Sequence, residues 1–316
     1  MRESETGSES LGELLDERSH LMNLAVRMLG SANDAEDVVQ QTYVRWFQLS
    51  DDERAAIERP RAWLTTVASR ICLNILDSAR ARRERYVGEW LPEPLPTATD
   101  AATASAPAID PLDRITLDDS VSMALLVVLE SLTPAERVAF VLHEVFAVPF
   151  AEIAEIVGRS PDATRQLASS ARRHIRELRV RPAEASEHAR LVRAFRLACE
   201  HGDLDALVAL LDPEVTSVSD GGGRVRAALR PIVGADNVAR FLLGVLRKAP
   251  DLAVEELEVN GELGLVVRAG DLVVGTVSLG TESGAAGVAD GECRIRNVWI
   301  TVNPDKLVAW NRGAAS

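Results

Sequence analysis

The residues most suited to binding a ligand gather between positions 164 and 176. Guanidinium, amide and hydroxyl side chains recur there, and these groups hydrogen-bond to the edges of bases or to phosphates. The segment from 165 to 181 holds six arginines against one glutamate, so a nucleic acid is the ligand that the pattern favours. We expect Arg165, Gln166 and Ser169 to read bases and Arg172, Arg173 and Arg176 to bind phosphates, with Thr164 beside them.

The segment that must position these side chains is Ala151–Leu178, which predicts a helix, a tight turn and a second helix. Gly158 ends the first helix, because glycine accepts a left-handed backbone at a helix end. Ser160 is a favourable N-cap for the second helix, and Pro161 suits its first position. A short helix pair around such a turn is typical of the helix-turn-helix. An ordinary helical hairpin with a solvated basic face is the alternative that this stretch alone leaves open.

A second basic segment runs from 57 to 86 and holds seven arginines against three acidic residues, on a chain of net charge −13. Two basic segments on an acidic chain predict two separate contacts with a polyanion. The second segment is predicted to be one helix, from Arg61 to about Arg85. Trp63 lies in its apolar stripe, so this ring is either a stacking platform for a base or a core residue. The candidate contacts of this helix are Trp63, Arg70, Asn74, Arg80, Arg82 and Arg83.

The composition limits the class of protein. A length of 316 residues suits two or three domains, and 47% apolar with 26% charged residues is typical of a globular chain. The acidic start is unlike a signal peptide and no apolar run reaches about 18 residues, which predicts a cytoplasmic protein without a membrane contact. Cys72, Cys199 and Cys293 are far apart, so we expect reduced thiols, no metal site and no cofactor.

The chain is predicted to divide where its composition changes. A stretch rich in Pro, Ala and Thr separates two helical parts and cannot bury a core of its own. Trp90 beside Pro92 is unusual in a free linker, so we expect Trp90 to dock on a folded surface. The predicted parts are a disordered tail at 1–10, a helical domain at 11–89, the linker at 90–111, the helix-turn-helix domain at 112–181 and a third domain at 184–316.

The third domain is predicted to be α+β. An amphipathic helix and the short helix Leu204–Leu211 open it, and the helix Ala235–Leu246 interrupts a series of strand-like runs. Turn signals such as Asn260-Gly261 separate these runs, which predicts a curved antiparallel sheet. The predicted strands are Val215–Val218, Leu252–Val259, Leu263–Arg268, Leu272–Leu279 and Cys293–Val302.

Three segments, in their order and spacing, resemble an extracytoplasmic-function (ECF) sigma factor, a promoter-specificity subunit of bacterial RNA polymerase. Asp34–Trp46 resembles the region 2 helix that binds the polymerase clamp. Pro60–Leu64 with the basic helix after it resembles the element that captures the −10 promoter strand. Leu132–Arg137 with the helix-turn-helix resembles region 4, which reads the −35 element. The resemblance implies two all-α sigma domains, a region 2 helical bundle and a region 4 helix-turn-helix.

The resemblance also implies the partners, which are promoter DNA and the clamp and flap of the RNA polymerase core. A −10 element is melted before it is read, which requires a basic surface and pockets for bases, whereas a −35 element stays duplex. The acidic start of Asp34–Trp46 also suits a helix N-terminus, and both interpretations can hold together. The proposed core contacts are Asp34, Asp37, Gln40, Gln41, Arg45 and Trp46.

The third domain resembles a cone-shaped SnoaL-like domain of the NTF2-like fold, an extension carried by the SigJ-like subgroup of these sigma factors. Three markers of that subgroup are present, at Trp90–Pro94, Asp220–Gly223 and Asn303–Leu307. We hypothesise that they form an internal latch through which the extension modulates the sigma unit in cis, in place of a separate anti-sigma protein. A flexible hairpin tip is the alternative for the glycine run. The regulatory set is Trp90, Pro92, Glu93, Asp220, Gly221, Gly222, Gly223, Asn303, Pro304, Asp305 and Lys306.

The rival function for the third domain is acid–base catalysis, which needs a carboxylate, histidine or tyrosine in an apolar pocket. Both tyrosines, Tyr43 and Tyr86, lie in the sigma portion. We expect His188 and His201 at the surface and Asp220 in a loop, so no enzyme is predicted. The alternative that stays open is a DNA-binding regulator fused to a small-molecule-binding or catalytic domain. An unknown small ligand in the cone pocket is compatible with either function.

Overall fold

The computed structural model describes residues 17–83, 86–96, 122–178, 183–282 and 293–311. The chain divides into two compact units, of which the first comprises residues 1–84, 109–119 and 128–177 and the second 85–108, 120–127 and 178–316. The predicted disordered tail at 1–10 and residues 97–111 of the predicted linker lie outside the described residues. In the described part of the chain, no helix is long and apolar enough to cross a membrane.

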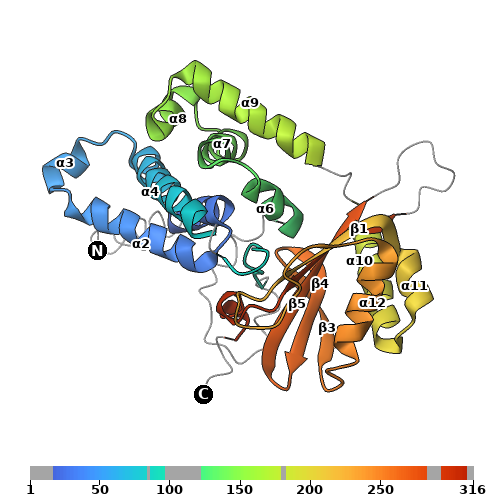
Figure 1. The fold of residues 1–316 in the computed structure, drawn as a ribbon. Coiled ribbons are helices and arrows are strands. Elements are labelled where there is room, and N and C mark those ends of the chain that lie inside the picture. The colour runs from blue at the N-terminus through green and yellow to red at the C-terminus, as the bar shows by residue number, and fades with distance from the viewer. Residues whose placement is uncertain (1–16, 84–85, 97–121, 179–182, 283–292, 312–316) are drawn as a thin grey trace. The chain divides into compact units, whose positions relative to one another are not determined.

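The described part of the first unit begins with a helix at residues 17–29, and three further helices follow it (Figure 1). Ser31 caps the first of these, as the sequence predicts, by accepting a hydrogen bond of 3.2 Å from the amide of Asp34. Leu24, Val38 and Ile71 are among the buried apolar residues of this part. The three helices are α2 (Ala32–Gln48), α3 (Asp51–Ala55) and α4 (Pro60–Arg83).

The helix-turn-helix prediction is confirmed in the second half of the same unit. Thr133 and Glu136 form the predicted capping box at the start of a helix. Gly158 ends the next helix with a left-handed φ of 66°, and the Ser160 hydroxyl accepts a hydrogen bond of 3.2 Å from the amide of Ala163. The elements are α6 (Met123–Glu130), whose residues 123–127 belong to the second unit, α7 (Pro134–Phe140), the π-helical turn η2 (Val141–Val145), α8 (Phe150–Val157) and α9 (Pro161–Leu178).

A buried arginine joins the helices of the first unit. Arg137 is 2% exposed. Its Nη1 donates to the carbonyl of Met28 at 2.9 Å and to the carboxylate of Glu130 at 2.8 Å. Burial lowers the pKa of Arg137 to about 9, so the side chain stays charged at neutral pH. Arg137 therefore holds α7 against the helix at 17–29.

His20 also connects the helix at 17–29 to the second half of the first unit. Its ring packs edge-on against Phe146, with 5.1 Å between the ring centroids. Arg61 lies 3.0 Å from Nδ1 and Thr65 lies 3.0 Å from Nε2. Burial and the charge of Arg61 lower the pKa of His20 to about 4, so the imidazole is neutral at pH 7 and Nδ1 accepts from Arg61.

The second unit is α+β, as predicted. Its helices α10, α11 and α12 cover one face of a sheet (Figure 1). Phe195, Leu207, Val238 and Ile295 are buried in the core between the helices and the sheet. The elements are α10 (Ala185–His201), α11 (Leu204–Leu210), β1 (Leu211–Asp220), β2 (Ile232–Val233), α12 (Ala235–Leu246), β3 (Ala253–Val259), β4 (Glu262–Ala269), β5 (Leu272–Glu282), β6 (Arg294–Thr301) and the short 3-10 turns η3 (Pro304–Lys306) and η4 (Ala309–Asn311).

The prediction of a purely antiparallel sheet is wrong. The strand order is β2-β1-β6-β5-β4-β3, and β1 pairs with β6 in parallel. A parallel pair requires a long connection, and here α12 and four strands, β2, β3, β4 and β5, intervene between β1 and β6. Hydrophobic runs predict strands but not their direction, and the two residues of β2 are too few for a pattern.

The strand β1 contributes to a packed cluster on each face of the sheet. Val215 belongs to the core beneath the helices. Val218 packs with Leu91 and Trp299 in a separate cluster. Because successive side chains of a strand point to opposite faces, Ser219 points toward the helices and Asp220 points toward the side that carries Leu91.

Candidate functional site

The helix α9 has one buried and one exposed face. Ala168, Ala171 and Ile175 are buried and fix the orientation of the helix. The predicted contacts lie on the other face, where they are accessible to DNA. The exposed set is Arg165, Gln166, Ser169, Arg172, Arg173 and Arg176.

Thr164 does not belong to this exposed face, and its burial contradicts the prediction that it contacts DNA. Its side chain is 0% exposed. Its hydroxyl donates to the carbonyl of Ser160 at 3.0 Å. Thr164 lies one turn into α9, where the hydroxyl closes the helix start and the methyl group packs inward. Its role is therefore to support the turn of the helix-turn-helix.

Two arginines of the α9 face make exposed ion pairs within the same unit. Arg165 pairs with Asp162, and Arg172 pairs with Glu144 at 2.5 Å. Exposed pairs contribute about 0–1 kcal/mol, so a phosphate can replace such a carboxylate at little cost. Arg173 and Arg176 have no acidic partner within the described residues. The face is thus available for an anionic ligand.

The helix α4, which is predicted to contact the −10 strand, has fewer of its predicted contact residues exposed and described than α9 has. Asn74 is exposed. Arg70 is exposed too, and it donates to the carbonyl of Glu155 at the α8 side of the unit, at 3.3 Å. Trp63 is half-buried and packs against Trp46 with 5.3 Å between ring centroids, which favours its packing role. The side chains of Arg80, Arg82 and Arg83 lie outside the described residues.

The helix α2 exposes more than the polar residues predicted from the sequence. Asp34, Asp37, Gln40, Gln41 and Arg45 are exposed and Trp46 is half-buried.

Val44 and Phe47 on the same helix are 54% and 62% exposed. Together with Val39 and Tyr43 they line a groove of about 730 Å³. Sequence reasoning missed Val44 and Phe47, because apolar residues at helical spacing are usually core residues. A patch of this kind is typical of a surface that binds another protein.

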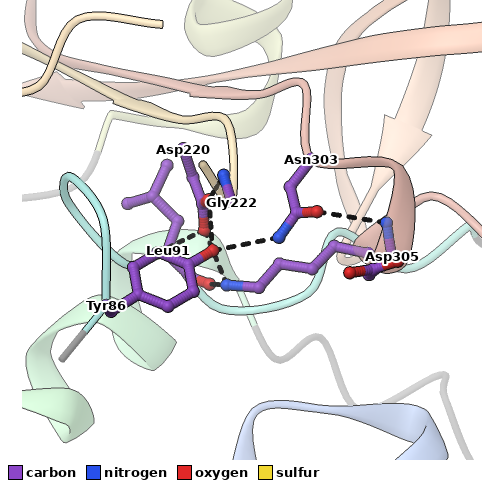
Figure 2. Close-up of polar contacts among 7 residues, drawn as sticks. Tyr86, Leu91, Asp220, Gly222, Asn303 and Asp305 are labelled. Carbon is purple, nitrogen blue, oxygen red and sulfur yellow. Dashed lines mark hydrogen bonds and ion pairs between the residues drawn. The ribbon is translucent and has the colours of Figure 1, made fainter. Parts of the chain in front are cut away.

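The three marker segments meet at the carboxylate of Asp220, which is 0% exposed (Figure 2). Its Oδ1 accepts from the hydroxyl of Tyr86 at 2.6 Å and from the amide of Gly222 at 3.0 Å. Its Oδ2 accepts from the amide of Leu91 at 3.0 Å and pairs with the ammonium of Lys306 at 2.6 Å. We call this arrangement of Tyr86, Leu91, Asp220, Asn303 and Lys306 the Asp220 site. The expectation that Asp220 lies in a loop is wrong, because it is the last residue of β1.

The ammonium of Lys306 is enclosed by groups from the linker. It donates to the carbonyl of Leu91 and lies 3.9 Å from the centroid of the Trp90 ring. Asn303 donates to the Tyr86 hydroxyl at 2.9 Å. Burial and the bond to Asp220 raise the pKa of Tyr86 well above its usual value, so the hydroxyl stays protonated and keeps donating. The expectation that Trp90 docks on a folded surface is confirmed.

Two glycines of the Asp220–Gly223 run are required by close approach. A Cβ at Gly221 would lie 2.3 Å from the carbonyl oxygen of Val225. Gly222 has a φ of 62°, and a Cβ there would lie 2.5 Å from the side chain of Asn303. Glycine is the residue that meets both conditions. The alternative of a flexible hairpin tip is therefore wrong for Gly221 and Gly222, which lie in a packed corner.

A second contact of the linker with the C-terminal domain lies further along the chain, at Leu95. The amide of Leu95 donates to Oδ1 of Asn260 at 2.5 Å, and the amide of Asn260 donates to the carbonyl of Leu95 at 2.9 Å. Trp310 donates through Nε1 to the carbonyl of Pro94 at 2.7 Å. Leu91, Pro92, Glu93, Pro94 and Leu95 are all buried as a result.

Sequence reasoning missed Tyr86, Asn260 and Trp310. Tyr86 was expected to serve the sigma portion, yet its hydroxyl belongs to the second unit. Asn260-Gly261 predicts a turn, and Asn260 does adopt a left-handed φ of 54° there. The pattern of a turn contains no signal that its asparagine side chain also binds a distant segment.

His188 is buried, which contradicts the expectation that it lies at the surface. It is 8% exposed. Its Nε2 lies 2.8 Å from the carbonyl of Leu263 and its Nδ1 lies 2.9 Å from the hydroxyl of Thr281. Both ring nitrogens are used in fastening α10 to the sheet. Among the residues that the structure describes, no cluster of three His, Cys, Asp or Glu side chains is arranged to hold a metal ion.

Comparison with known proteins decides the family. Residues 15–83 match the family model of sigma-70 region 2, and residues 122–175 match that of sigma-70 region 4. The ECF RNA polymerase sigma factor SigJ of Mycobacterium tuberculosis is 43% identical over 298 residues, which cover 92% of this chain and 90% of SigJ. The chain belongs to the ECF RNA polymerase sigma factors. As a member of that family it directs promoter recognition through regions 2 and 4.

The similarity of this ECF sigma factor to its relatives extends through the C-terminal domain. The probable ECF sigma factor SigI of Mycobacterium tuberculosis is 37% identical over 291 residues, which cover 92% of each chain. The crystal structure of Mycobacterium tuberculosis SigJ aligns with a TM-score of 0.71 at 37% identity, over 95% of this chain and 98% of that one. The predicted fold class of two all-α sigma domains followed by an α+β domain is confirmed, while the SnoaL/NTF2-like type of the third domain stays a prediction.

Proposed function

We propose that this sigma factor uses the α9 face for the −35 element, α4 for the −10 strand and α2 for the polymerase core, and that the Asp220 site controls the linker between regions 2 and 4. The observation that carries the last point is the burial of residues 91–95 on the C-terminal domain. The proposal also includes the domain borders that the sequence predicts, at residues 89, 111 and 181.

The proposed regulation follows from the length of the tether. The helices α4 and α6 are joined by residues 84–122, and residues 86–96 of that stretch are packed into the second unit. Each residue of extended chain spans at most about 3.3–3.6 Å, so docking removes a substantial part of the reach available to region 4. Release of the segment would let the two regions contact both promoter elements. We therefore propose that docking restrains transcription initiation.

The α9 face supports a prediction for promoter binding. Replacing Arg173 and Arg176 with glutamine should weaken binding to every promoter duplex and reduce the slope of log affinity against log salt by about 1 per arginine. Replacing Gln166 with alanine should instead relax the base preference at the −35 element by about 1–3 kcal/mol. Fluorescence anisotropy with labelled duplexes at several salt concentrations measures both effects.

The matched control is Lys248→Gln, which removes one exposed positive charge outside α9. It should leave the affinity and the salt slope unchanged. Equal losses for Lys248→Gln and for the α9 variants would contradict the assignment of the −35 contact to α9, because a general charge effect would then explain them.

The apolar patch on α2 supports a prediction for core binding. Val44→Ala together with Phe47→Ala should weaken binding to purified core polymerase about 10-fold or more, since exposed aromatic residues at an interface often carry much of the affinity. Leu272→Ala is the control, because Leu272 is 48% exposed and lies in β5. Unchanged core affinity in the α2 variant, measured by competition with wild-type protein, would refute the role of the patch.

Sigma factors are transcription initiation factors that do not catalyse a reaction themselves. We infer further that the C-terminal domain is not catalytic, since its buried carboxylate Asp220 is fully engaged in hydrogen bonds and an ion pair. We also propose that the protein acts in the cytoplasm and that control in cis takes the place of a separate anti-sigma protein. A DNA-binding regulator fused to an enzyme is less consistent with the region 2 match.

A further inference from the structure

The C-terminal domain contains a cavity of about 950 Å³ on the face of the sheet that the helices cover. Its inner wall is apolar and consists of buried side chains from the helices and the sheet. Pockets of 300–1,000 Å³ with apolar walls and a few polar groups are typical of small-molecule sites. Representative wall residues are Phe195, Leu242, Leu243, Leu265 and Val277.

One residue that lines this cavity carries a buried polar group without a partner. The hydroxyl of Ser219 is buried and makes no hydrogen bond in the structure, and Ser219 lines the cavity. Its side chain is 4% exposed. An unsatisfied buried hydroxyl is unfavourable, and because its oxygen has almost no accessible surface here, rotation of the side chain about χ1 would bring it to a ligand atom.

The opening of the cavity is positively charged. Four arginines line it against one glutamate, on a chain of net charge −13. Arg196 pairs with Glu256, and Arg240 pairs with Asp236. Arg226 and Arg247 are exposed and have no acidic partner in the described part of the chain. Arg247 donates through Nε to the carbonyl of Leu243 at 3.3 Å, so its two Nη groups and the guanidinium of Arg226 can bind an anionic group at the mouth.

The cysteine that lines the cavity carries no negative charge that would repel such an anion. Cys199 lines the cavity. Burial raises the pKa of its thiol to about 12, so the group is neutral at physiological pH. Among the described residues of the lining, Glu200 is the only carboxylate, and it is paired with Arg196 at 2.6 Å.

We propose that this cavity binds a small amphipathic carboxylate, with its apolar body inside and its acid group at Arg226 and Arg247. The Ser219 hydroxyl would bond to a polar atom near the inner end of the ligand. A cation is disfavoured by the arginines, and a nucleotide is disfavoured by the apolar walls. The inference concerns binding alone and does not depend on the proposed control of the linker.

The test is isothermal titration calorimetry on the full-length protein with three pairs of probes. Decanoate and 2-naphthoate are compared with the alcohols decan-1-ol and 2-naphthol and with the ions decylammonium and (2-naphthyl)methylammonium. All probes are used below any micellar concentration. We expect at least one carboxylate to bind at one site per chain, and its alcohol and ammonium analogues to bind at least 10-fold more weakly. Binding of neither carboxylate overturns the proposal, and equal binding of acid and alcohol overturns the assigned chemical class.

Variants locate the site. Arg226→Gln with Arg247→Gln should weaken carboxylate binding about 10-fold, whereas Arg230→Gln, an exposed arginine outside the lining, should leave it unchanged. Leu246→Trp should fill the cavity and abolish binding. Thermal unfolding checks that this variant is folded, and the arginine variants decide the outcome if it is not. Full affinity in the Arg226 and Arg247 double variant would place the ligand elsewhere and overturn the proposal.

Discussion

Replacing Asp220 with alanine should release residues 90–96 from the C-terminal domain. The carboxylate accepts three hydrogen bonds and holds the ammonium of Lys306, and its side chain has no access to water. Removing one partner of a buried ion pair costs about 3–5 kcal/mol, because the other charge is left uncompensated. Here that charge is Lys306, which also binds the carbonyl of Leu91. The lost free energy therefore weakens the binding of the linker to the C-terminal domain.

The release is measured at amides that the substitution does not touch. Leu95 and Asn260 bond to each other in the second linker contact. Their hydrogen exchange should accelerate on the order of 10²-fold or more, as 1.4 kcal/mol corresponds to a factor of ten. Lys306→Met added to Asp220→Ala should recover part of the protection, because no charge then remains buried.

Asp305→Asn is the matched control for this prediction. Asp305 lies next to Lys306 and pairs with Arg224 at 3.1 Å, but both side chains are more than half exposed. Loss of an exposed pair costs about 0–1 kcal/mol. Equal exchange rates in the Asp220→Ala and Asp305→Asn proteins would show that the Asp220 site does not hold the linker.

Replacing Arg137 with leucine should destabilise the first unit by about 3–5 kcal/mol. The buried side chain of Arg137 connects α7 to the carboxylate of Glu130 and to the carbonyl of Met28. Its loss removes the ion pair with the carboxylate of Glu130, which is 13% exposed. Chemical denaturation should show the first unit unfolding at a lower denaturant concentration, while the second unit is unaffected.

Two further variants separate the buried charge from simple loss of contact. Arg137→Leu with Glu130→Leu should recover most of the stability, because the buried pair is replaced by apolar groups. Arg59→Gln breaks the exposed pair with Glu152, at 3.0 Å, and should cost at most about 1 kcal/mol. A loss in Arg137→Leu no larger than that in Arg59→Gln would contradict a structural role for the buried arginine.

The sequence was sufficient to predict the elements whose local signals are strong. The capping box at Thr133, the glycine end at Gly158 and the Ser160 cap lie where local chemistry places them. The helix Ala235–Leu246 has the predicted bounds. The exposed arginines of α9 follow from one helical period, because the same period places Ala168 and Ala171 inside.

The Asp220 site could be predicted only in part. Marker segments indicated that Asp220, Trp90 and Lys306 belong together, but no local pattern revealed the bonds that Tyr86 and Asn260 make over more than a hundred residues. The same limit applies to Thr164, whose hydroxyl type suited DNA but whose place in the helix start buries it. Strand direction in the β1–β6 pair is likewise a consequence of the whole domain.

The central claim is that docking of the linker at the Asp220 site restrains initiation. It is tested most directly by run-off transcription with purified core polymerase and equal amounts of full-length wild-type, Asp220→Ala and Asp305→Asn protein. The account predicts a severalfold higher transcript yield for Asp220→Ala and a wild-type yield for Asp305→Asn. An unchanged or lower yield for Asp220→Ala, in protein whose linker is shown by hydrogen exchange to be released, would contradict it.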